Sequence, residues 1–150
     1  MAIRPAREAE FETLTSLWEA SVRASHHFLP EQVIQELRPQ LLSDWLPAVN
    51  VNVYENAAGN LLGFSGVLQQ KLEMLFILPE ARGRGVGKAL LEEAIASQNV
   101  YLVDVNEQNE LAAGFYKHAG FEVMSRSPLD GQGRPYPLLH MRLFSHNPVE

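Results

Sequence analysis

The sequence predicts one α/β domain, and three observations lead to that fold class. The chain has 150 residues, of which 46% are hydrophobic and 20% charged, as in a globular domain large enough to bury a core. Short apolar runs at strand spacing cluster before residue 79, and strand and helix patterns alternate after it. No repeat or long linker divides the chain, so we expect residues 1–150 to form a single domain.

The first third of the chain predicts a short edge strand at residues 2–4, followed by two helices. Apolar residues recur at helical spacing among charges in residues 8–23, which is typical of an amphipathic helix. Residues 31–44 repeat this pattern more weakly, and Pro39 should break or kink the second helix.

The middle third predicts three strands. Residues 50–55 and 61–69 are joined by the turn sequence NAAGN, so they should form a hairpin. The run LEMLFIL at 72–78 is apolar at nearly every position, as in a central strand that is covered on both faces. We therefore place this third strand in the middle of the sheet.

The last third predicts alternating helices and strands. A helix with one apolar side should follow the glycine-rich turn PEARGRGVGKA at 79–89. A buried strand is expected at 101–105 and a second helix at 109–119, ended by Gly120, which suits the left-handed backbone after a helix. The final strands are FEVMSR at 121–126 and PLLHMRL at 137–143.

Composition excludes several classes of function. The net charge of −6 argues against a nucleic-acid partner, and the chain has no cysteine for a disulfide, a thiolate metal site or a nucleophile. The five histidines show no metal-ligand spacing, so we expect no metal. No apolar run approaches the ~20 residues that span a bilayer, and the N-terminus does not resemble a signal peptide. We expect a cytoplasmic protein with no membrane partner.

The glycine-rich turn predicts an anion site. A strand, a glycine turn and a helix together point several backbone N–H groups and the positive end of a helix dipole at one place. Arginine and lysine around the glycines suit a phosphate, although a tight turn with a solvated basic rim remains the alternative. A nucleoside-triphosphate loop fails because Ala89 follows Lys88, and the dinucleotide pattern fails because Lys88 replaces its third glycine.

The turn resembles motif A of the GNAT superfamily of N-acetyltransferases, Arg/Gln-x-x-Gly-x-Gly/Ala, through Arg82, Gly85 and Gly87. The segment NELAAGFYKHAGF at 109–121 resembles a second family motif. Its matching residues are Asn109, Ala112, Phe115, Tyr116, Gly120 and Phe121. The resemblance covers about residues 50–143, and the first helices agree in general plan, with added closeness to small bacterial members described as protein-lysine acetyltransferases.

This resemblance implies a mixed, mostly antiparallel sheet of six to seven strands with about four helices, in which strands four and five are parallel and splayed. It also implies acetyl-CoA as co-substrate, with its pyrophosphate in the glycine loop, and a backbone amide near Met74 to Phe76 that holds the thioester carbonyl. The implied acetyl-CoA contacts are Met74, Leu75, Phe76, Ile77, Arg82, Gly83, Arg84, Gly85, Val86, Gly87, Lys88, Asn109 and Tyr116.

The family chemistry assigns catalytic roles to two residues. Tyr116 matches the tyrosine that gives a proton to the departing sulfur, or else it is a packed helix residue. Glu73 is the one acid in an apolar strand, so it is a candidate for the base that deprotonates the amine and for substrate contact, or it lies where the strand meets solvent. His26 is a candidate acceptor-site residue, and His27 a surface residue.

The implied function is acetyl transfer to a primary amine, on a protein lysine or on a small molecule, by direct transfer in a ternary complex. No cysteine is present and no activated serine is evident, so no acyl-enzyme is expected. The alternatives are a catalytically silent CoA-binding sensor or interaction module, and a nucleotide-binding protein. The fold does not identify the acceptor, and either a monomer or a homodimer fits the family.

Overall fold

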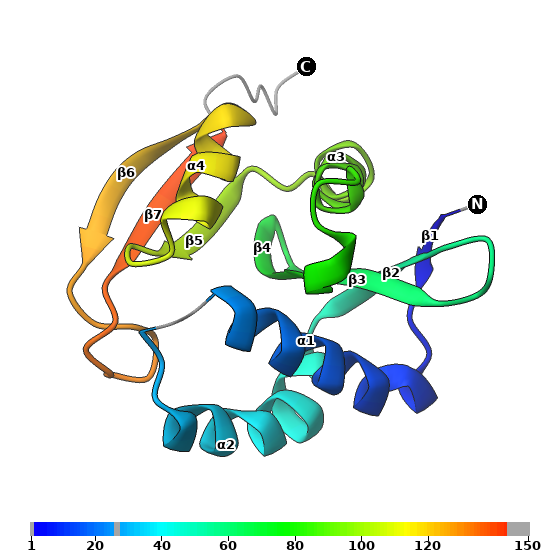
Figure 1. Ribbon diagram of the computed structural model, residues 1–150. Helices are drawn as coiled ribbons and strands as arrows, with labels where there is room; N and C mark the ends of the chain where they lie inside the picture. The colour runs from blue at the N-terminus through cyan, green and yellow to red at the C-terminus, as the bar shows by residue number, and fades with distance from the viewer. Residues whose placement is uncertain (1, 26–27, 144–150) are drawn as a thin grey trace.

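The computed structural model describes residues 2–25 and 28–143. Its centre is a seven-stranded sheet of order β1-β2-β3-β4-β5-β7-β6, with helices on both faces (Figure 1). Among the strands that the structure describes, only β4 and β5 pair in parallel, and the other neighbours are antiparallel. The strands are β1 (Ile3–Pro5), β2 (Asn50–Glu55), β3 (Leu61–Leu68), β4 (Lys71–Ile77), β5 (Leu102–Asn106), β6 (Phe121–Ser127) and β7 (Leu138–Leu143). The expected mixed α/β sheet is confirmed.

The described residues contain four α-helices, arranged in two layers around the sheet (Figure 1). They are α1 (Phe11–Ser25), α2 (Glu31–Gln40), α3 (Val86–Gln98) and α4 (Glu110–His118). Apolar residues of α1 and α2 pack with β2 and β3 on one face. Those of α3 and α4 pack with β4, β5 and β7 on the other. None of the described helices is both long and apolar enough to cross a membrane.

The two N-terminal helices differ in detail from the sequence prediction. The first begins as a 3-10 turn at Glu8–Glu10 and becomes α-helical only at Phe11. Pro39 does not end the second helix, which runs through it to Gln40 and continues as a π-helical turn at Leu41–Trp45. Because proline lacks an N–H donor, the regular hydrogen-bond ladder is disturbed there, and the wider turn follows it.

The parallel pair at the centre of the sheet opens after two residue pairs. Lys71 pairs with Leu102 and Leu72 with Val103, and the register between β4 and β5 goes no further. On its other edge, β4 carries one extra residue, Glu73, between the partners of Val67 and Gly66 on β3. Such a bulge bends a strand and increases its twist. The bulge coincides with the point where β4 leaves β5, which confirms the expected splay.

Candidate active site

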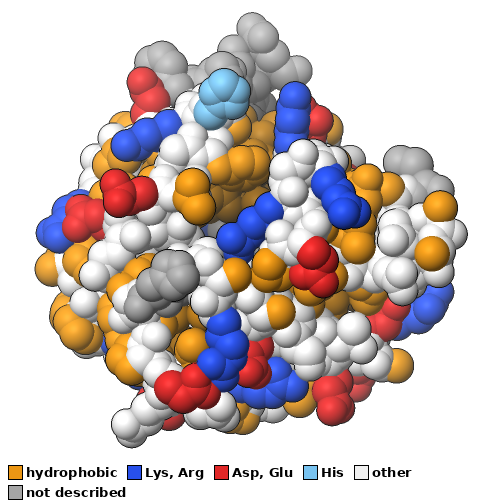
Figure 2. All heavy atoms as spheres, in the orientation of Figure 1, with side chains coloured by type: hydrophobic (Ala, Val, Ile, Leu, Met, Phe, Trp, Pro, Cys, Tyr) orange, Lys and Arg blue, Asp and Glu red, His pale blue; other side chains and the backbone are white. Residues whose placement is uncertain are grey.

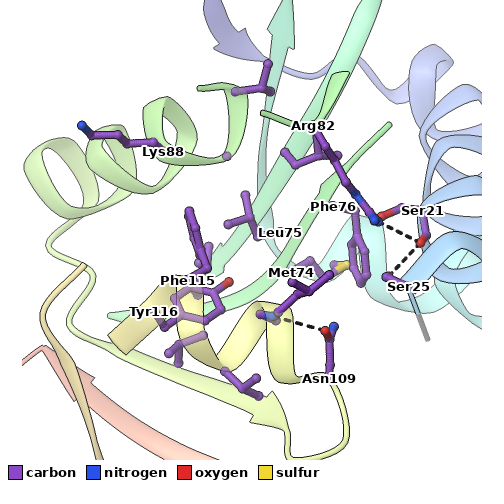
Figure 3. Close-up of a pocket in the computed structure, with 18 of the residues that line it drawn as sticks. Ser21, Ser25, Met74, Leu75, Phe76, Arg82, Lys88, Asn109, Phe115 and Tyr116 are labelled. Carbon is purple, nitrogen blue, oxygen red and sulfur yellow. Dashed lines mark hydrogen bonds between the residues drawn. The ribbon is translucent and has the colours of Figure 1, made fainter. Parts of the chain in front are cut away.

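A cleft of about 540 Å³ occupies the opening between β4 and β5. Its walls come from both strands, the glycine turn, the first turn of α3, the first two turns of α4, and the end of α1 (Figure 3). Figure 2 shows a hollow on this face with apolar side chains in its depth and basic side chains beside it. The cleft therefore joins a basic rim to an apolar interior.

The glycine turn has the backbone that an anion cradle requires. Gly83 and Gly85 have φ values of +79° and +81°, and Gly85 is the residue before the first turn of α3. Ala89 N–H donates to the Gly85 carbonyl, whereas the N–H groups before it begin the helix without such partners. Since a Cβ on either glycine would meet no atom within 4 Å, backbone conformation and not crowding demands glycine here.

The third glycine of the turn has a different environment. A Cβ on Gly87 would meet Ile77 and Phe115 at 3.6 and 3.7 Å, which are ordinary contact distances. Its φ is not positive, so neither strain nor packing among the described residues requires glycine. Gly87 lines the cleft, and the absence of a side chain there leaves the helix N-terminus open to a ligand.

The basic residues of the turn point to different places. Arg82 lines the cleft, and its Nη2 donates to the Ser21 carbonyl at 3.2 Å, which connects the turn to α1 (Figure 3). Lys88 lies on the first turn of α3 and also lines the cleft. Arg84 instead lines a smaller hollow beside Tyr54 and the β2–β3 turn. The structure therefore brings Arg82 and Lys88 together at this cleft and leaves Arg84 outside it.

Strand β4 supplies the floor of the cleft. Met74, Leu75, Phe76 and Ile77 all line it. Met74 and Phe76 pack toward the α1 side of the sheet, and Leu75 and Ile77 toward the α3 side. Their backbone edge faces the opening because β5 is no longer paired with it. The opening therefore connects the α1 side of the sheet with the α3 side.

Glu73 occupies the bulge at the narrow end of the opening. It lines the cleft, and its side chain is 35% exposed, with a carboxylate oxygen 3.9 Å from Lys71 Nζ. A place where the strand meets solvent and a place in the cleft are therefore compatible for Glu73, because the strand meets solvent at the cleft. His26 and His27 lie outside the described residues.

Tyr116 lines the cleft from α4 and is buried. Its ring makes edge contacts with Phe115 and Phe121, at centroid distances of 5.1 and 5.7 Å. Burial raises the pKa of the phenol above its ordinary value, because the charged phenolate would be poorly solvated there. Tyr116 is thus a packed residue that also presents a neutral phenol to the cleft.

Asn109 caps α4. Its Oδ1 accepts a hydrogen bond from the Ala112 N–H at 3.2 Å, which makes Asn109 the N-cap of this helix (Figure 3). Asn109 also lines the cleft. The cap holds the start of the helix that carries Tyr116.

Sequence reasoning missed several residues of the cleft. They are Ser21, Ser25, Leu72, Ala81, Val103, Asp104, Val105, Asn106, Leu111, Ala112 and Phe115. The residues on β5 could have been found from the expected splay, because the splay exposes the facing edges of both β4 and β5.

No activated serine is evident in the sequence, but the structure brings one serine beside a histidine. Ser127 Oγ lies 2.6 Å from His140 Nε2, a contact between two strands that the sequence does not reveal. Ser127 is, however, not among the described residues that line the cleft.

The splayed sheet and its glycine turn define an acetyltransferase, and residues 48–123 match the family model described as an acetyltransferase (GNAT) domain. The chain belongs to this GNAT family and is an N-acetyltransferase that uses acetyl-CoA. The cradle, with its left-handed glycines and open helix N-terminus, fits the phosphates of that co-substrate.

Several known proteins are similar to this chain over nearly their whole length. Peptidyl-lysine N-acetyltransferase YjaB of Escherichia coli (strain K12) is 41% identical over 141 residues, which cover 94% of this chain and 95% of that protein. YjaB of Salmonella typhimurium (strain LT2) is 41% identical over 139 residues, which cover 93% of this chain and 95% of that protein. The solution structure of apo-form YjaB from Escherichia coli superposes with a TM-score of 0.88 at 40% identity, covering 97% and 98% of the two chains.

Proposed function

We propose that this enzyme acetylates lysine side chains of proteins by direct transfer from acetyl-CoA. The observation that carries the proposal is the 41% identity to a peptidyl-lysine N-acetyltransferase across nearly all of both chains. The cleft supports it, because Glu73 and Asp104, the two acidic residues among its described lining, suit an acceptor that arrives as an ammonium.

Each part of the cleft has a task in this proposal. The helix N-terminus with Arg82 and Lys88 binds the phosphates, and the backbone edge of β4 beyond its last pair with β5 donates to the thioester carbonyl. Acetyl-CoA supplies the activated acyl group. Tyr116 gives its proton to the departing sulfur, which would otherwise leave as a thiolate in an apolar cleft. Because Ser127 does not line the cleft, the amine attacks directly and no acetyl-enzyme forms.

The acceptor class can be tested with two matched peptides. One carries a single lysine with both ends blocked, and the other has arginine in its place. We expect free thiol release and a mass gain of one acetyl group only with the lysine peptide. Release only with a polyamine or an aminoglycoside would contradict a protein acceptor. Binding of acetyl-CoA without release for any amine would favour the silent CoA-binding module.

Direct transfer is tested by intact mass. After incubation with acetyl-CoA alone, the enzyme should keep its unmodified mass. A stoichiometric acetyl group on Ser127 that then moves to the peptide would overturn direct transfer. The Ser127→Ala variant separates that case from slow, non-enzymatic lysine acetylation, because only the former would disappear.

A further inference from the structure

A chain of polar contacts crosses four strands next to the cleft. His140 on β7 lies directly opposite Asp104 on β5, and its Nδ1 is 2.7 Å from Asp104 Oδ1. The other ring nitrogen, Nε2, is 2.6 Å from Ser127 Oγ on β6. The second oxygen of the same carboxylate, Oδ2, contacts Nζ of Lys71 on β4. One carboxylate is therefore held on one side by an imidazole and on the other by an ammonium.

This chain of contacts lies on the face of the sheet opposite α4. Val103 and Val105 are buried in the core beside α4, so Asp104 between them points to the opposite face, as successive strand residues do. Met141 is buried in the same core, which places the neighbouring His140 on the face of Asp104. The side chains of Asp104 and His140 are 23% and 33% exposed, so solvent and an acceptor can reach them.

Asp104 is also the first residue of β5 beyond the last pair with β4. It lines the cleft together with Glu73, which is the extra residue of the β4 bulge. Lys71 Nζ touches Asp104 and lies 3.9 Å from Glu73. A lysine ammonium thus already contacts Asp104 and approaches Glu73, although Lys71 itself is not among the described residues that line the cleft, so an ammonium fits beside this pair of carboxylates.

We propose that Asp104 is the residue that binds the acceptor ammonium and receives its proton, at the Oδ2 position that Lys71 now occupies. The proposal rests on the proposed function, since it assigns the site where the acceptor amine is deprotonated. An N–H bond of the ammonium breaks, the proton passes to Asp104 Oδ2, and the nitrogen keeps the electron pair with which it attacks. The incoming ammonium displaces that of Lys71.

His140 is a positioning residue in this scheme. With a hydrogen on Nδ1 it donates to Oδ1 and fixes the carboxylate plane, while Ser127 O–H donates to Nε2 and fixes the ring. The charged and titratable groups around it are Asp104 and Lys71, with Glu73 beyond them.

The test compares Asp104→Asn with Lys71→Met, using the blocked lysine peptide. Asp104→Asn should lower kcat/KM at pH 7 by about 10²-fold, the usual range for a proton acceptor. The deficit should shrink as the pH approaches the lysine value of about 10.4, because the amine then arrives already neutral. Lys71→Met should instead lower the KM for the peptide, because it removes an internal competitor. Equal losses in both variants would show that the ion pair is only structural and would overturn the proposal.

Four further measurements separate a role in the reaction from a role in the fold. Acetyl-CoA affinity should be unchanged in Asp104→Asn, and Asp44→Asn, an exposed acid far along the chain, should keep full activity. His140→Gln, which keeps a donor beside Asp104, should lower kcat/KM by less than Asp104→Asn and by less than His140→Ala. If Glu73→Gln alone abolished the pH dependence while Asp104→Asn kept it, Glu73 would be the proton acceptor.

A binding experiment is independent of turnover and of acceptor identity. n-Butylammonium, which copies the end of a lysine side chain, should shift the carboxyl carbon-13 signal of Asp104, and more strongly in Lys71→Met. If the Asp104 signal did not shift in Lys71→Met, the proposal would be wrong. If the enzyme acetylates another amine and not lysine, the proposed function fails. The ratio of wild-type to Asp104→Asn activity with that amine would still test Asp104.

Discussion

The phenol ring of Tyr116 packs between Phe115 and Phe121 and reaches the cleft. Because burial raises its pKa above the ordinary value, the phenol keeps its proton to higher pH than an exposed tyrosine would. An unperturbed tyrosine with a pKa of about 10 would lose the proton in alkaline solution. Ionisation of Tyr116 should lower the rate in alkaline solution. This fall should lie at a higher pH than it would for an unperturbed tyrosine.

Replacing Tyr116 with phenylalanine keeps the ring contacts and removes the proton. We expect kcat to fall by roughly 10²-fold while acetyl-CoA affinity changes little. Steady-state kinetics with calorimetry would measure both quantities. An unchanged kcat, in a step shown to be chemical, would reduce Tyr116 to a packing residue.

Sequence could predict the site residues that lie within one continuous motif. The glycines, Arg82 and Asn109 belong to such motifs, and the structure places all of them at the cleft. Arg84 belongs to the same turn but points to another hollow, because alternate residues of a tight turn face different directions. Asp104 and His140 are 36 residues apart and meet only through the β5–β7 register, so no local pattern reveals their contact.

At the scale of an element, α3 depends on the backbone that precedes it. Gly85 has a φ of +81°, which costs an L-residue about 1–2 kcal/mol. Gly85→Ala should therefore lower both the stability and the acetyl-CoA affinity, as the cradle shifts to relieve the strain. Urea unfolding and calorimetry would measure these effects. Gly131→Ala in the β6–β7 loop, where φ is not positive and no atom crowds the Cβ, is the matched control.

In helix α4, unlike at Gly85, the backbone does not require a glycine. Gly114 lies in its interior and is exposed, and a Cβ added there would meet no atom within 4 Å. Gly114→Ala should stabilise the protein by about 0.5–1 kcal/mol, because alanine loses less backbone entropy in a helix. Thermal unfolding should show a midpoint higher by about 1–4 °C. A lower midpoint would mean that α4 needs the flexibility of this glycine.

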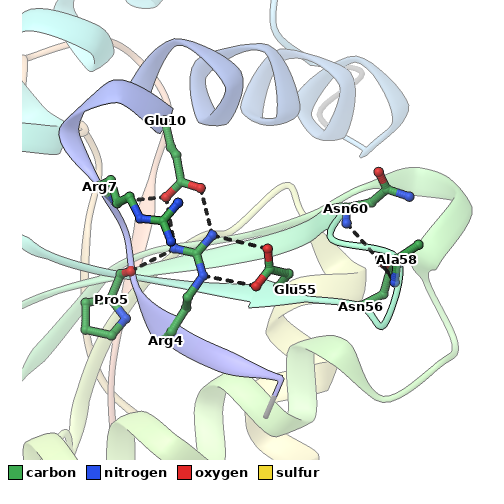
Figure 4. A network of polar contacts seen from close by, with 8 residues as sticks. All are labelled: Arg4, Pro5, Arg7, Glu10, Glu55, Asn56, Ala58 and Asn60. Atoms are coloured by element: carbon green, nitrogen blue, oxygen red, sulfur yellow. Dashed lines mark hydrogen bonds and ion pairs between the residues drawn. The ribbon is translucent and has the colours of Figure 1, made fainter.

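Strand β1 is fastened to the sheet by an arginine between two acids (Figure 4). Arg4 donates to Glu10 at 2.7 and 3.0 Å and to Glu55 at 3.1 Å. Glu10 also accepts the Arg7 backbone N–H at 2.8 Å. The Arg4 guanidinium, above all, lowers the pKa of Glu10 from 4.5 to about 2. The contact therefore ties the edge strand, the turn before α1 and β2 together.

The pH dependence of this contact has a definite sign. Since the pKa of Glu10 is lower in the folded protein, the stabilisation is complete above about pH 4.5 and is lost as the pH falls toward 2. Arg4→Met should be less stable than wild type at pH 7, and the difference should shrink through that window. Urea unfolding at several pH values would measure it, with Lys117→Met, exposed on α4, as control. A difference that does not change with pH would point to lost packing.

At the scale of the whole molecule, the order of elements was predictable, but their pairing was less so. The hairpin β2–β3 follows from its turn, and the central place of β4 from its apolar run. The insertion of β7 between β5 and β6 was not predicted, because a long-range register leaves no local trace in the sequence. The bulge at Glu73 is likewise a property of the paired sheet.

Ligand binding should stabilise the whole domain, since the cleft lies between its strands. Acetyl-CoA at about 100 times its dissociation constant adds about 2.7 kcal/mol, or about 5–10 °C in the thermal midpoint for this chain length. ATP and NAD at equal concentration should give smaller shifts, because they cannot fill the apolar opening. An equal shift with NAD would support a nucleotide-binding protein instead.

The two-pair junction between β4 and β5 also bears on how long the protein survives. Where a sheet is joined so briefly, local opening costs little, and proteases act on chains that open. Acetyl-CoA between the strands bridges the junction, so a molecule with its co-substrate should resist trypsin longer than one without it. The amount of this enzyme in a cell would then follow the supply of acetyl-CoA, with no change in its synthesis.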